Sequence, residues 1–149
     1  MSHQITKSII VQGDAADLFD LWADFENFPN FIKEIKSVEK IDEYTSHWVM
    51  EGPFGVTIEW DAETTRLEPN RRIAWSSKGD SGDITTSGQV TFTPLPQRET
   101  EVTVTLHYAP RTSLPHEIAV PLFNNTEERL LRDLRNFKAY AEGMAERII

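Results

Sequence analysis

An alternation of apolar and polar residues predicts β-strands over much of this chain. The clearest run is VTIEWDAE, residues 56–63, in which every second residue is apolar and the residues between them are polar or charged. A strand with this pattern has one dry face and one wet face, which is typical of an antiparallel sheet that is covered on one side. Further strands are predicted at residues 3–12, 35–43, 46–51, 73–75, 89–93 and 101–108.

Beyond Asn125 a spacing of three or four residues between apolar side chains replaces this alternation. The spacing predicts one amphipathic helix of about 20 residues at the C-terminal end of the chain. Its apolar face would carry Leu130, Leu134, Phe137, Ala141, Met144 and Ile148.

Two shorter helices are predicted directly after the first strand. Asp14 is expected to cap the first of them by accepting hydrogen bonds from its free amides. The second is predicted to run from residue 27 to about residue 33, with Pro29 in its first turn, where a missing N–H costs nothing. The two predicted helices together are rich in aromatic side chains, namely Trp22, Phe25, Phe28 and Phe31.

The segment 110–124 contains three prolines and is predicted to form an irregular connection. The predicted order is therefore one strand, two short helices, about six strands and one long helix. This order indicates an α+β protein. Because the apolar face of a sheet must be covered, and only the C-terminal helix is long enough, we expect that helix to lie across the sheet.

Composition narrows the possible functions. A chain of 149 residues suits one domain, which we expect to span residues 1–149. Its formal net charge of -9 disfavours nucleic acid as a partner. Cysteine is absent, and no apolar stretch approaches the roughly 20 residues that a membrane span needs. We therefore expect a cytoplasmic protein without stable membrane insertion, and the sequence indicates no cofactor.

Local sequence adds a family resemblance. The segments FENFPNFIKEIKSVEKID, SGQVTFTPL, TEVTVTLHYAP and LRDLRNFKAYAE resemble those of the START-related (SRPBCC) helix-grip superfamily, in its bacterial polyketide cyclase/dehydrase-like subgroup. The resemblance covers roughly residues 3–145. It implies a curved antiparallel sheet of about six to seven strands wrapped around a long C-terminal helix, with a cavity between the two. Members include lipid carriers, quinone-binding proteins and a minority of enzymes, so the fold leaves the role open.

Under this resemblance, apolar and aromatic residues of the inward face would form the wall of a ligand cavity. The aromatic residues of the short helices would close one end of the sheet, either as ordinary core or as cavity wall. Tryptophans on the strands could equally line a pocket or fill a curved sheet. The predicted wall comprises Phe28, Phe31, Trp48, Ile58, Trp60, Trp75, Phe92, Leu106, Tyr108, Leu130, Leu134 and Phe137.

Few candidates for catalytic chemistry stand out. The Tyr108 hydroxyl could point into the cavity as a donor and is a weak catalytic candidate. Charged residues on the inward face are expected only at Arg66 or Arg72, near strand ends. The arginines of the last helix alternate with acidic residues such as Asp133. This pattern predicts that they lie on a solvent-exposed face of the helix. No metal site is predicted, because His47 and His107 are each expected to be isolated on wet faces.

Three functions remain compatible with these features. The favoured one is binding or transport of a small hydrophobic ligand, such as a lipid, a quinone or a polyketide-like molecule. The alternative is an aromatase/cyclase that acts on a polyketide. A second alternative is a protein-interaction domain whose core is filled.

Overall fold

The structure is a computed structural model that describes residues 3–79, 82–111 and 114–148. These residues form β-strands, one α-helix after the first strand, two α-helices after the last strand, and three short 3-10 helices. In chain order these are β1 (His3–Gln12), α1 (Ala15–Ala23), η1 (Phe25–Asn30), β2 (Ile35–Lys40), β3 (Thr45–Glu51), η2 (Pro53–Gly55), β4 (Thr57–Glu68), β5 (Arg72–Ser77), β6 (Ile84–Leu95), η3 (Pro96–Arg98), β7 (Glu99–Pro110), α2 (His116–Leu122) and α3 (Thr126–Ile148).

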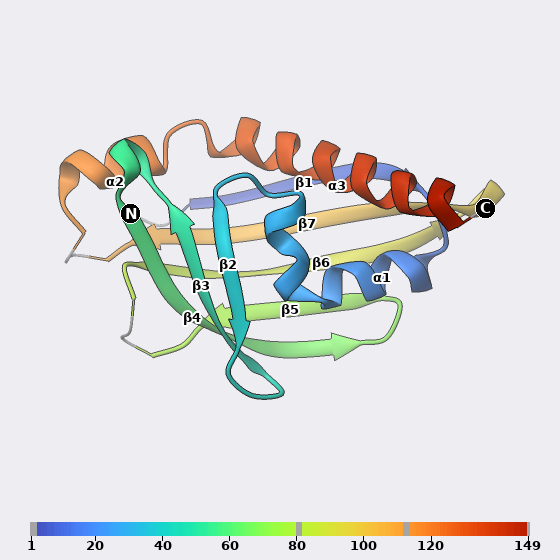
Figure 1. Cartoon of the computed structure of the whole chain (residues 1–149), viewed down its shortest axis with the longest axis horizontal. Helices are drawn as coiled ribbons and strands as arrows, with labels where there is room; N and C mark the ends of the chain where they lie inside the picture. Colours follow the sequence, from blue (N-terminus) through green and yellow to red (C-terminus); the bar gives the residue numbers. More distant parts are fainter. Residues whose placement is uncertain (1–2, 80–81, 112–113, 149) are drawn as a thin grey trace.

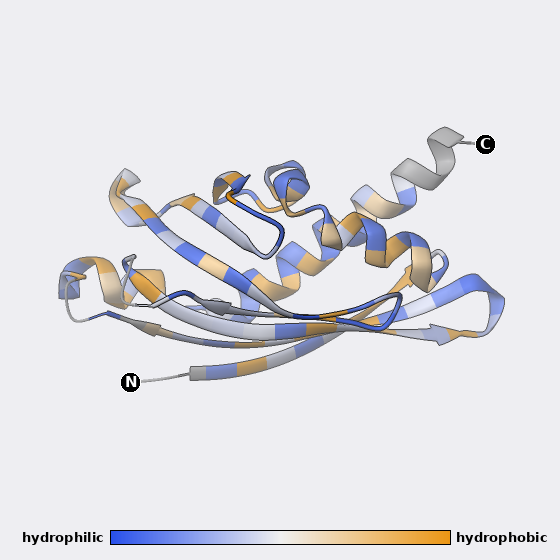
Figure 2. Ribbon diagram, turned by 90° about the horizontal axis from the view of Figure 1, so that it is seen from below, coloured by the Kyte–Doolittle hydropathy of each residue, from blue (hydrophilic) through white to orange (hydrophobic). Residues whose placement is uncertain are grey.

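The strands form a single seven-stranded sheet with the order β1-β7-β6-β5-β4-β3-β2. Every neighbouring pair is antiparallel, and β1 returns to pair with the last strand, β7, along its whole length. The sheet curls into a half-barrel, and α1, η1 and α3 lie on its concave side (Figures 1 and 2). This arrangement confirms the predicted α+β helix-grip fold with its curved antiparallel sheet.

The long C-terminal helix α3 crosses the concave face of the sheet and packs beside β1. Its 23 residues confirm the predicted long amphipathic helix. Leu134, Phe137 and Ala141 are buried along it, as expected for side chains spaced by three or four residues. The hydropathy of the ribbon accordingly alternates along α3 and along the strands (Figure 2).

The short-helix pair differs from its prediction in two details. Asp14 occupies the N-cap position of α1, but no capping hydrogen bond comes from its side chain, because its carboxylate accepts from Arg98 at 2.9 Å instead. The second helix is the 3-10 helix η1, which starts at Phe25, so Pro29 lies inside it rather than in its first turn. The bend therefore falls at Asp24, one residue before the run of phenylalanines.

The hairpin of β2 and β3 turns at residues 41–44, and β2 is shorter than predicted. The Asp42 carboxylate accepts hydrogen bonds from the amides of Tyr44 and Thr45, both at 2.9 Å. A side chain that satisfies two backbone donors in this way stabilises a turn and ends the ladder early.

The connection 110–124, predicted to be irregular, contains the helix α2. Pro115 precedes its first residue with a φ of -57°, a position in which the missing N–H costs nothing. Pro121 lies near its C-terminal end. Pro110 ends β7, Pro115 precedes α2 and Pro121 lies within its last turn, so the three prolines do not exclude a short helix. In the part of the chain that the structure describes, none of the helices is long and apolar enough to cross a membrane.

Candidate ligand-binding cavity

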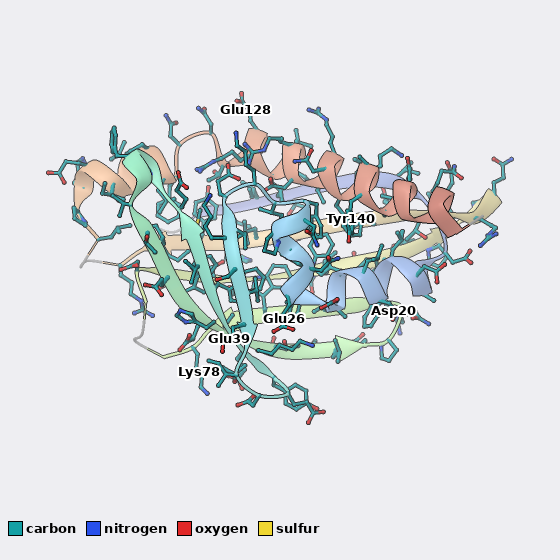
Figure 3. All side chains as sticks on the ribbon, viewed as in Figure 1. Asp20, Glu26, Glu39, Lys78, Glu128 and Tyr140 are labelled. Atoms are coloured by element: carbon teal, nitrogen blue, oxygen red, sulfur yellow. The ribbon has the colours of Figure 1, made fainter. Side chains whose placement is uncertain are left out.

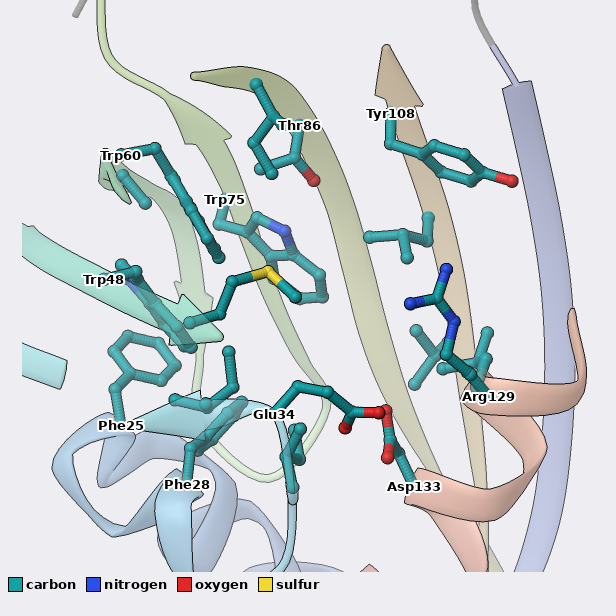
Figure 4. A pocket seen from close by; sticks show the side chains of 18 of the residues that line it. Phe25, Phe28, Glu34, Trp48, Trp60, Trp75, Thr86, Tyr108, Arg129 and Asp133 are labelled. Carbon is teal, nitrogen blue, oxygen red and sulfur yellow. The ribbon is translucent and has the colours of Figure 1, made fainter. Parts of the chain in front are cut away.

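A cavity of about 250 Å³ lies between the curled sheet and the N-terminal half of α3 (Figure 4). Side chains from β3 to β7 form its floor. The segment around η1 forms one side, and α2 and α3 form the other. Its surface is mostly apolar, with a few hydroxyl side chains, Glu63 of β4, and one charged cluster that is described below.

Aromatic rings dominate the end of the cavity beneath β3, β4 and β5. Trp48 and Trp60 are direct cross-strand partners, and their rings are stacked with 5.9 Å between centroids and 13° between planes. Phe25 and Phe28 approach Trp48 from the short helices, at 5.9 and 5.2 Å (Figure 4). The Trp48 Nε1–H donates to Ser46 Oγ at 2.8 Å, so this ring offers the cavity its apolar faces rather than its donor.

Nine of the twelve predicted wall residues line this cavity: Phe28, Phe31, Trp48, Trp60, Trp75, Leu106, Tyr108, Leu130 and Leu134. Trp22 and Phe25 line it as well, and they also pack against the other aromatic residues of the short helices. The aromatic residues of the short helices are therefore both core and cavity wall, since each ring lines the cavity and also packs against neighbouring rings.

Ile58, Phe92 and Phe137 were predicted to line the cavity, but the structure places them in the packed core. Their side chains are 0%, 3% and 0% exposed. Trp22 fills the space between Phe92 and Phe137, with centroid separations of 6.4 and 5.0 Å. The cavity therefore ends where the rings of α1 reach α3. Strand alternation identifies the inward face but not this end point.

The charged cluster consists of Glu34, Arg129, Arg132 and Asp133, all of which line the cavity. Arg132 Nη2 donates to both carboxylate oxygens of Glu34 at 2.6 Å and to Asp133 Oδ1 at 3.1 Å. Glu34 lies between η1 and β2, whereas the other three residues lie on α3. The cluster therefore joins the two sides of the cavity by charge-assisted hydrogen bonds.

The two carboxylates of this cluster respond differently to the same arginine. Burial first, and the Glu34 charge to a smaller extent, raise the pKa of Asp133 to about 6, because the opposing effects of Arg132 and Arg129 only partly compensate. Burial also raises the pKa of Glu34, but hydrogen bonds from Arg132 and from the backbone outweigh it and lower that pKa overall. Asp133 thus titrates close to neutral pH, while Glu34 stays ionised.

This cluster corrects the sequence prediction for the charged residues. The arginines and Asp133 of α3 were predicted to lie on a solvated face. Arg129, Arg132 and Asp133 are instead half-buried and line the cavity, whereas Arg135 is exposed as predicted. Arg66 is instead exposed and pairs with Glu68 at 3.2 Å, and neither it nor Arg72 lines the cavity. One signal was present in the sequence. Asp133 lies three residues after Leu130, at a position of the helix that the apolar spacing places toward the sheet.

The predicted position of Tyr108 agrees with the structure, because its side chain is buried and lines the cavity. Its hydroxyl is hydrogen-bonded to Thr126 Oγ1 at the start of α3. The Phe123 ring stacks on the Tyr108 ring with 5.0 Å between centroids. These contacts fix the position of the hydroxyl at the same end of the cavity as the charged cluster (Figure 4).

His47, which was predicted to be isolated, has two acidic partners on the outer face of the sheet. Its Nδ1 lies 2.6 Å from Asp61 Oδ1 and its Nε2 lies 2.9 Å from Glu59 Oε1. Hydrogen bonds to Asp61 and then Glu59 raise the pKa of His47. Among the residues that the structure describes, no group of three or more such side chains is placed to hold a metal ion.

Comparison with known proteins places the chain in a family. Residues 11–135 match the family described as polyketide cyclase / dehydrase and lipid transport. An uncharacterised 17.2 kDa protein of Streptomyces lincolnensis is 32% identical over 97 residues, which are 65% of this chain and 61% of that relative's length.

Solved structures are similar to the fold described above. A protein of Deinococcus radiodurans is 33% identical, with a TM-score of 0.72 over 92% of this chain and 95% of that chain. An aromatase/cyclase of a Streptomyces species gives a TM-score of 0.80 at 18% identity, over 95% and 94% of the two chains. A START superfamily protein of Mycobacterium smegmatis gives 0.76 at 19% identity, over 95% and 99%. The last two similarities show the fold alone. By sequence match and fold, the chain belongs to the polyketide cyclase / dehydrase and lipid transport family.

Proposed function

We propose that this protein binds and carries a compact, ring-containing hydrophobic molecule in the cavity beneath α3. The observation that carries this proposal is the wall itself, which combines stacked tryptophans, further aromatic rings and aliphatic side chains around an unfilled volume. Flat ring faces that are already positioned by protein contacts can bind a planar ligand without losing side-chain freedom, which favours affinity.

The size of the cavity limits the ligand. Its volume of about 250 Å³ corresponds to roughly eight water molecules in the liquid. Typical small-molecule sites range from about 300 to 1,000 Å³. We therefore propose a ligand of one or two fused rings rather than a lipid with two acyl chains. Among the classes predicted from the sequence, a quinone or a small polyketide-like aromatic molecule fits best.

Native mass spectrometry of freshly purified protein, together with calorimetric titration of 2-naphthol, tests the proposal. We expect bound mass or 2-naphthol binding in the wild type, and loss of binding in Leu130→Trp, because Leu130 lies on the cavity wall and a larger ring would fill the cavity. Leu67→Trp is the matched control, since Leu67 is 50% exposed on β4 and does not line the cavity. Unchanged binding in Leu130→Trp, or no bound molecule of any kind, would refute the proposal.

A second candidate function is acid–base catalysis on a ketone, as in a cyclase or dehydratase. The observation that favours it is Asp133, a carboxyl group that is 20% exposed and has a pKa of about 6 beside two arginines in an apolar cavity. A group whose pKa lies near the working pH is suited to general acid–base catalysis. Turnover of a poly-ketone mimic that falls at least about 100-fold in Asp133→Asn, with binding retained, would support this function. Absence of turnover in the wild type would leave the carrier role.

The remaining alternative required a filled core. The cavity contradicts that requirement, because the space between the sheet and the N-terminal half of α3 is open rather than packed.

A further inference from the structure

The charged cluster of the cavity is neutral as a whole when both of its carboxylates are ionised. The charged groups that face Asp133 are Glu34, from the segment between η1 and β2, and Arg129 and Arg132, from its own helix. The polar side chains at this end on β7 and at the start of α3 are hydroxyls, those of Tyr108 and Thr126. Two positive charges thus meet two negative charges.

One nitrogen of each arginine is also occupied by the protein, whereas Arg132 Nε is buried without a hydrogen-bond partner among the described residues and is left for an acceptor atom of a ligand. Arg132 donates to Glu34 and Asp133, as described above. Arg129 Nη2 donates to the carbonyl oxygens of Leu122 and Asn124, the latter at 3.0 Å. The positive charges therefore already have anionic or carbonyl partners before any ligand enters.

These contacts decide which polar group a ligand can bring to this end of the cavity. A carboxylate would be a third negative charge beside Glu34 and Asp133, and burial of an uncompensated charge is strongly unfavourable. A protonated amine would likewise be a third positive charge beside Arg129 and Arg132. A hydroxyl adds no charge, can donate to a carboxylate oxygen, and can accept from a guanidinium.

We infer that the cavity selects ligands whose polar end is a neutral hydroxyl or keto group, and that the Glu34–Arg132–Asp133 cluster rejects ligands that carry a carboxylate. This inference rests on the proposed carrier function and names the class of ligand within it: a small phenol, enol or quinone-like molecule, rather than a fatty or aromatic acid. Discrimination of this kind depends on repulsion by the site as much as on attraction.

Two probes with the same ring system, 2-naphthol and 2-naphthoate, isolate the effect of the polar group. Calorimetric titration of the wild type at pH 8 should show 2-naphthol binding at least about tenfold more tightly, since the site would hold a third carboxylate without a counter-ion. In Asp133→Asn the difference should shrink to within about threefold, through tighter binding of 2-naphthoate.

Glu128→Gln is the matched control, because it removes one negative charge from the same helix. Glu128 is exposed and points away from the sheet at the start of α3 (Figure 3). This variant should keep the wild-type preference. If it also gains affinity for 2-naphthoate, overall charge rather than the cluster sets the preference, and the inference is wrong.

A change of pH provides a test that needs no substitution. At pH 5 Asp133 is largely protonated, whereas 2-naphthoate, with an ordinary carboxyl pKa near 4, stays mostly ionised. Binding of 2-naphthoate by the wild type should then tighten by about tenfold relative to pH 8. Glu34→Gln serves as a second variant in case Asp133→Asn does not fold. It should bind 2-naphthoate at pH 8 more tightly than the wild type does, as expected for Asp133→Asn.

The possible outcomes separate the inference from the proposed function. If both probes bind equally well at pH 8, or if 2-naphthoate binding is the same at pH 5 and pH 8, the carrier proposal stands and the inference fails. If neither probe binds and no other ligand is recovered, both fail. A preference for 2-naphthol that disappears in Asp133→Asn and persists in Glu128→Gln supports the inference.

Discussion

Burial and charge pairing have opposite effects on the pKa of Asp133. Removal from water raises the pKa of this carboxyl, while the hydrogen bond from Arg132 lowers it, and burial dominates. Both carboxylate oxygens of the neighbouring Glu34 accept hydrogen bonds from the same guanidinium, and Glu34 keeps its charge. A single arginine therefore stabilises one carboxylate fully and leaves the second near its titration point.

This imbalance predicts a pH-dependent cost of folding. Because the folded state binds the Asp133 proton more tightly than the unfolded state does, ionisation of Asp133 lowers stability as pH rises from about 4 to about 6, and the loss is complete above that range. The free energy of unfolding of Asp133→Asn minus that of the wild type should therefore increase by roughly 2–3 kcal/mol from pH 4 to pH 7.

Urea denaturation at closely spaced pH values measures this difference. Asp20→Asn is the control, since Asp20 is an exposed carboxylate on α1 (Figure 3), and its pH profile should follow that of the wild type. A difference between Asp133→Asn and the wild type that stays constant from pH 4 to pH 7 would show that burial does not dominate at this position.

At the scale of elements, α3 divides into two halves with different roles. Residues of its first two turns, including Leu130 and Asp133, line the cavity. Phe137 and Ala141, farther along, are buried against the core. The same apolar stripe thus first covers an open volume and then packs closely, because the aromatic residues of α1 and η1 occupy only the second part of the space beneath the helix.

The floor of the cavity depends on a close approach between strands at Gly88. This residue of β6 pairs with Trp75 of β5 and with Leu106 of β7, both of which line the cavity. A Cβ at Gly88 would meet the carbonyl oxygen of Thr105 and would lie 2.9 Å from Trp75 Cζ2. Glycine here lets the Trp75 ring lie flat over the neighbouring strand.

Gly88→Ala is therefore expected to destabilise the protein by about 1–3 kcal/mol and to weaken 2-naphthol binding, because the backbone of β7 and the Trp75 ring must both move. Gly143→Ala is a contrasting variant of the same chemistry. A Cβ at Gly143, on α3, has nothing within 4 Å, and alanine should stabilise the helix by up to about 1 kcal/mol. Thermal denaturation of both variants checks the prediction, which fails if the two substitutions have effects of the same sign.

At the scale of the whole molecule, the two ends of the sheet are closed in different ways. At one end the rings of Trp22, on α1, and of Phe31, directly after η1, fill the space up to Phe137 of α3. At the other, α2 contributes Leu122 to the cavity and is followed directly by Phe123, which also lines it; α2 packs beside η2. In contrast, β7 lies between β1 and β6 and is paired along its length on both sides. Stability is therefore expected to be distributed unevenly.

Hydrogen exchange with mass spectrometry tests this difference. Amides of α2 should exchange at least about 100-fold faster than those of central β7, since a seven-residue helix that contains a proline opens locally at low cost. Addition of 2-naphthol should slow exchange in α2 more than in β1, which lies outside the cavity wall. Equal protection of α2 and β7 without ligand would contradict the uneven distribution.

Much of the fold follows from local pattern. Alternation in the strands and three- or four-residue spacing beyond Asn125 reflect the periods of extended and helical backbone, so they predict the elements and their inward faces. The helix α2 was missed because prolines are counted as helix breakers, although Pro115 precedes the first turn and leaves it intact. Among candidate wall residues, the same periodicity identified Trp60 and Trp75 as inward-facing, together with Ile58, which it could not distinguish from them.

The sequence by itself determined which side chains face inward, because the repeat of each element is a local property of the backbone. Only the tertiary structure decided where the concave side stays open and where it is filled, since that depends on how far rings from α1 and η1 reach toward α3. The tertiary structure also decided the pKa values of the Glu34 and Asp133 carboxyl groups. Residues almost 100 positions apart share Arg132 in the folded chain, and burial of a charge is a property of the assembled surroundings rather than of the segment that carries it.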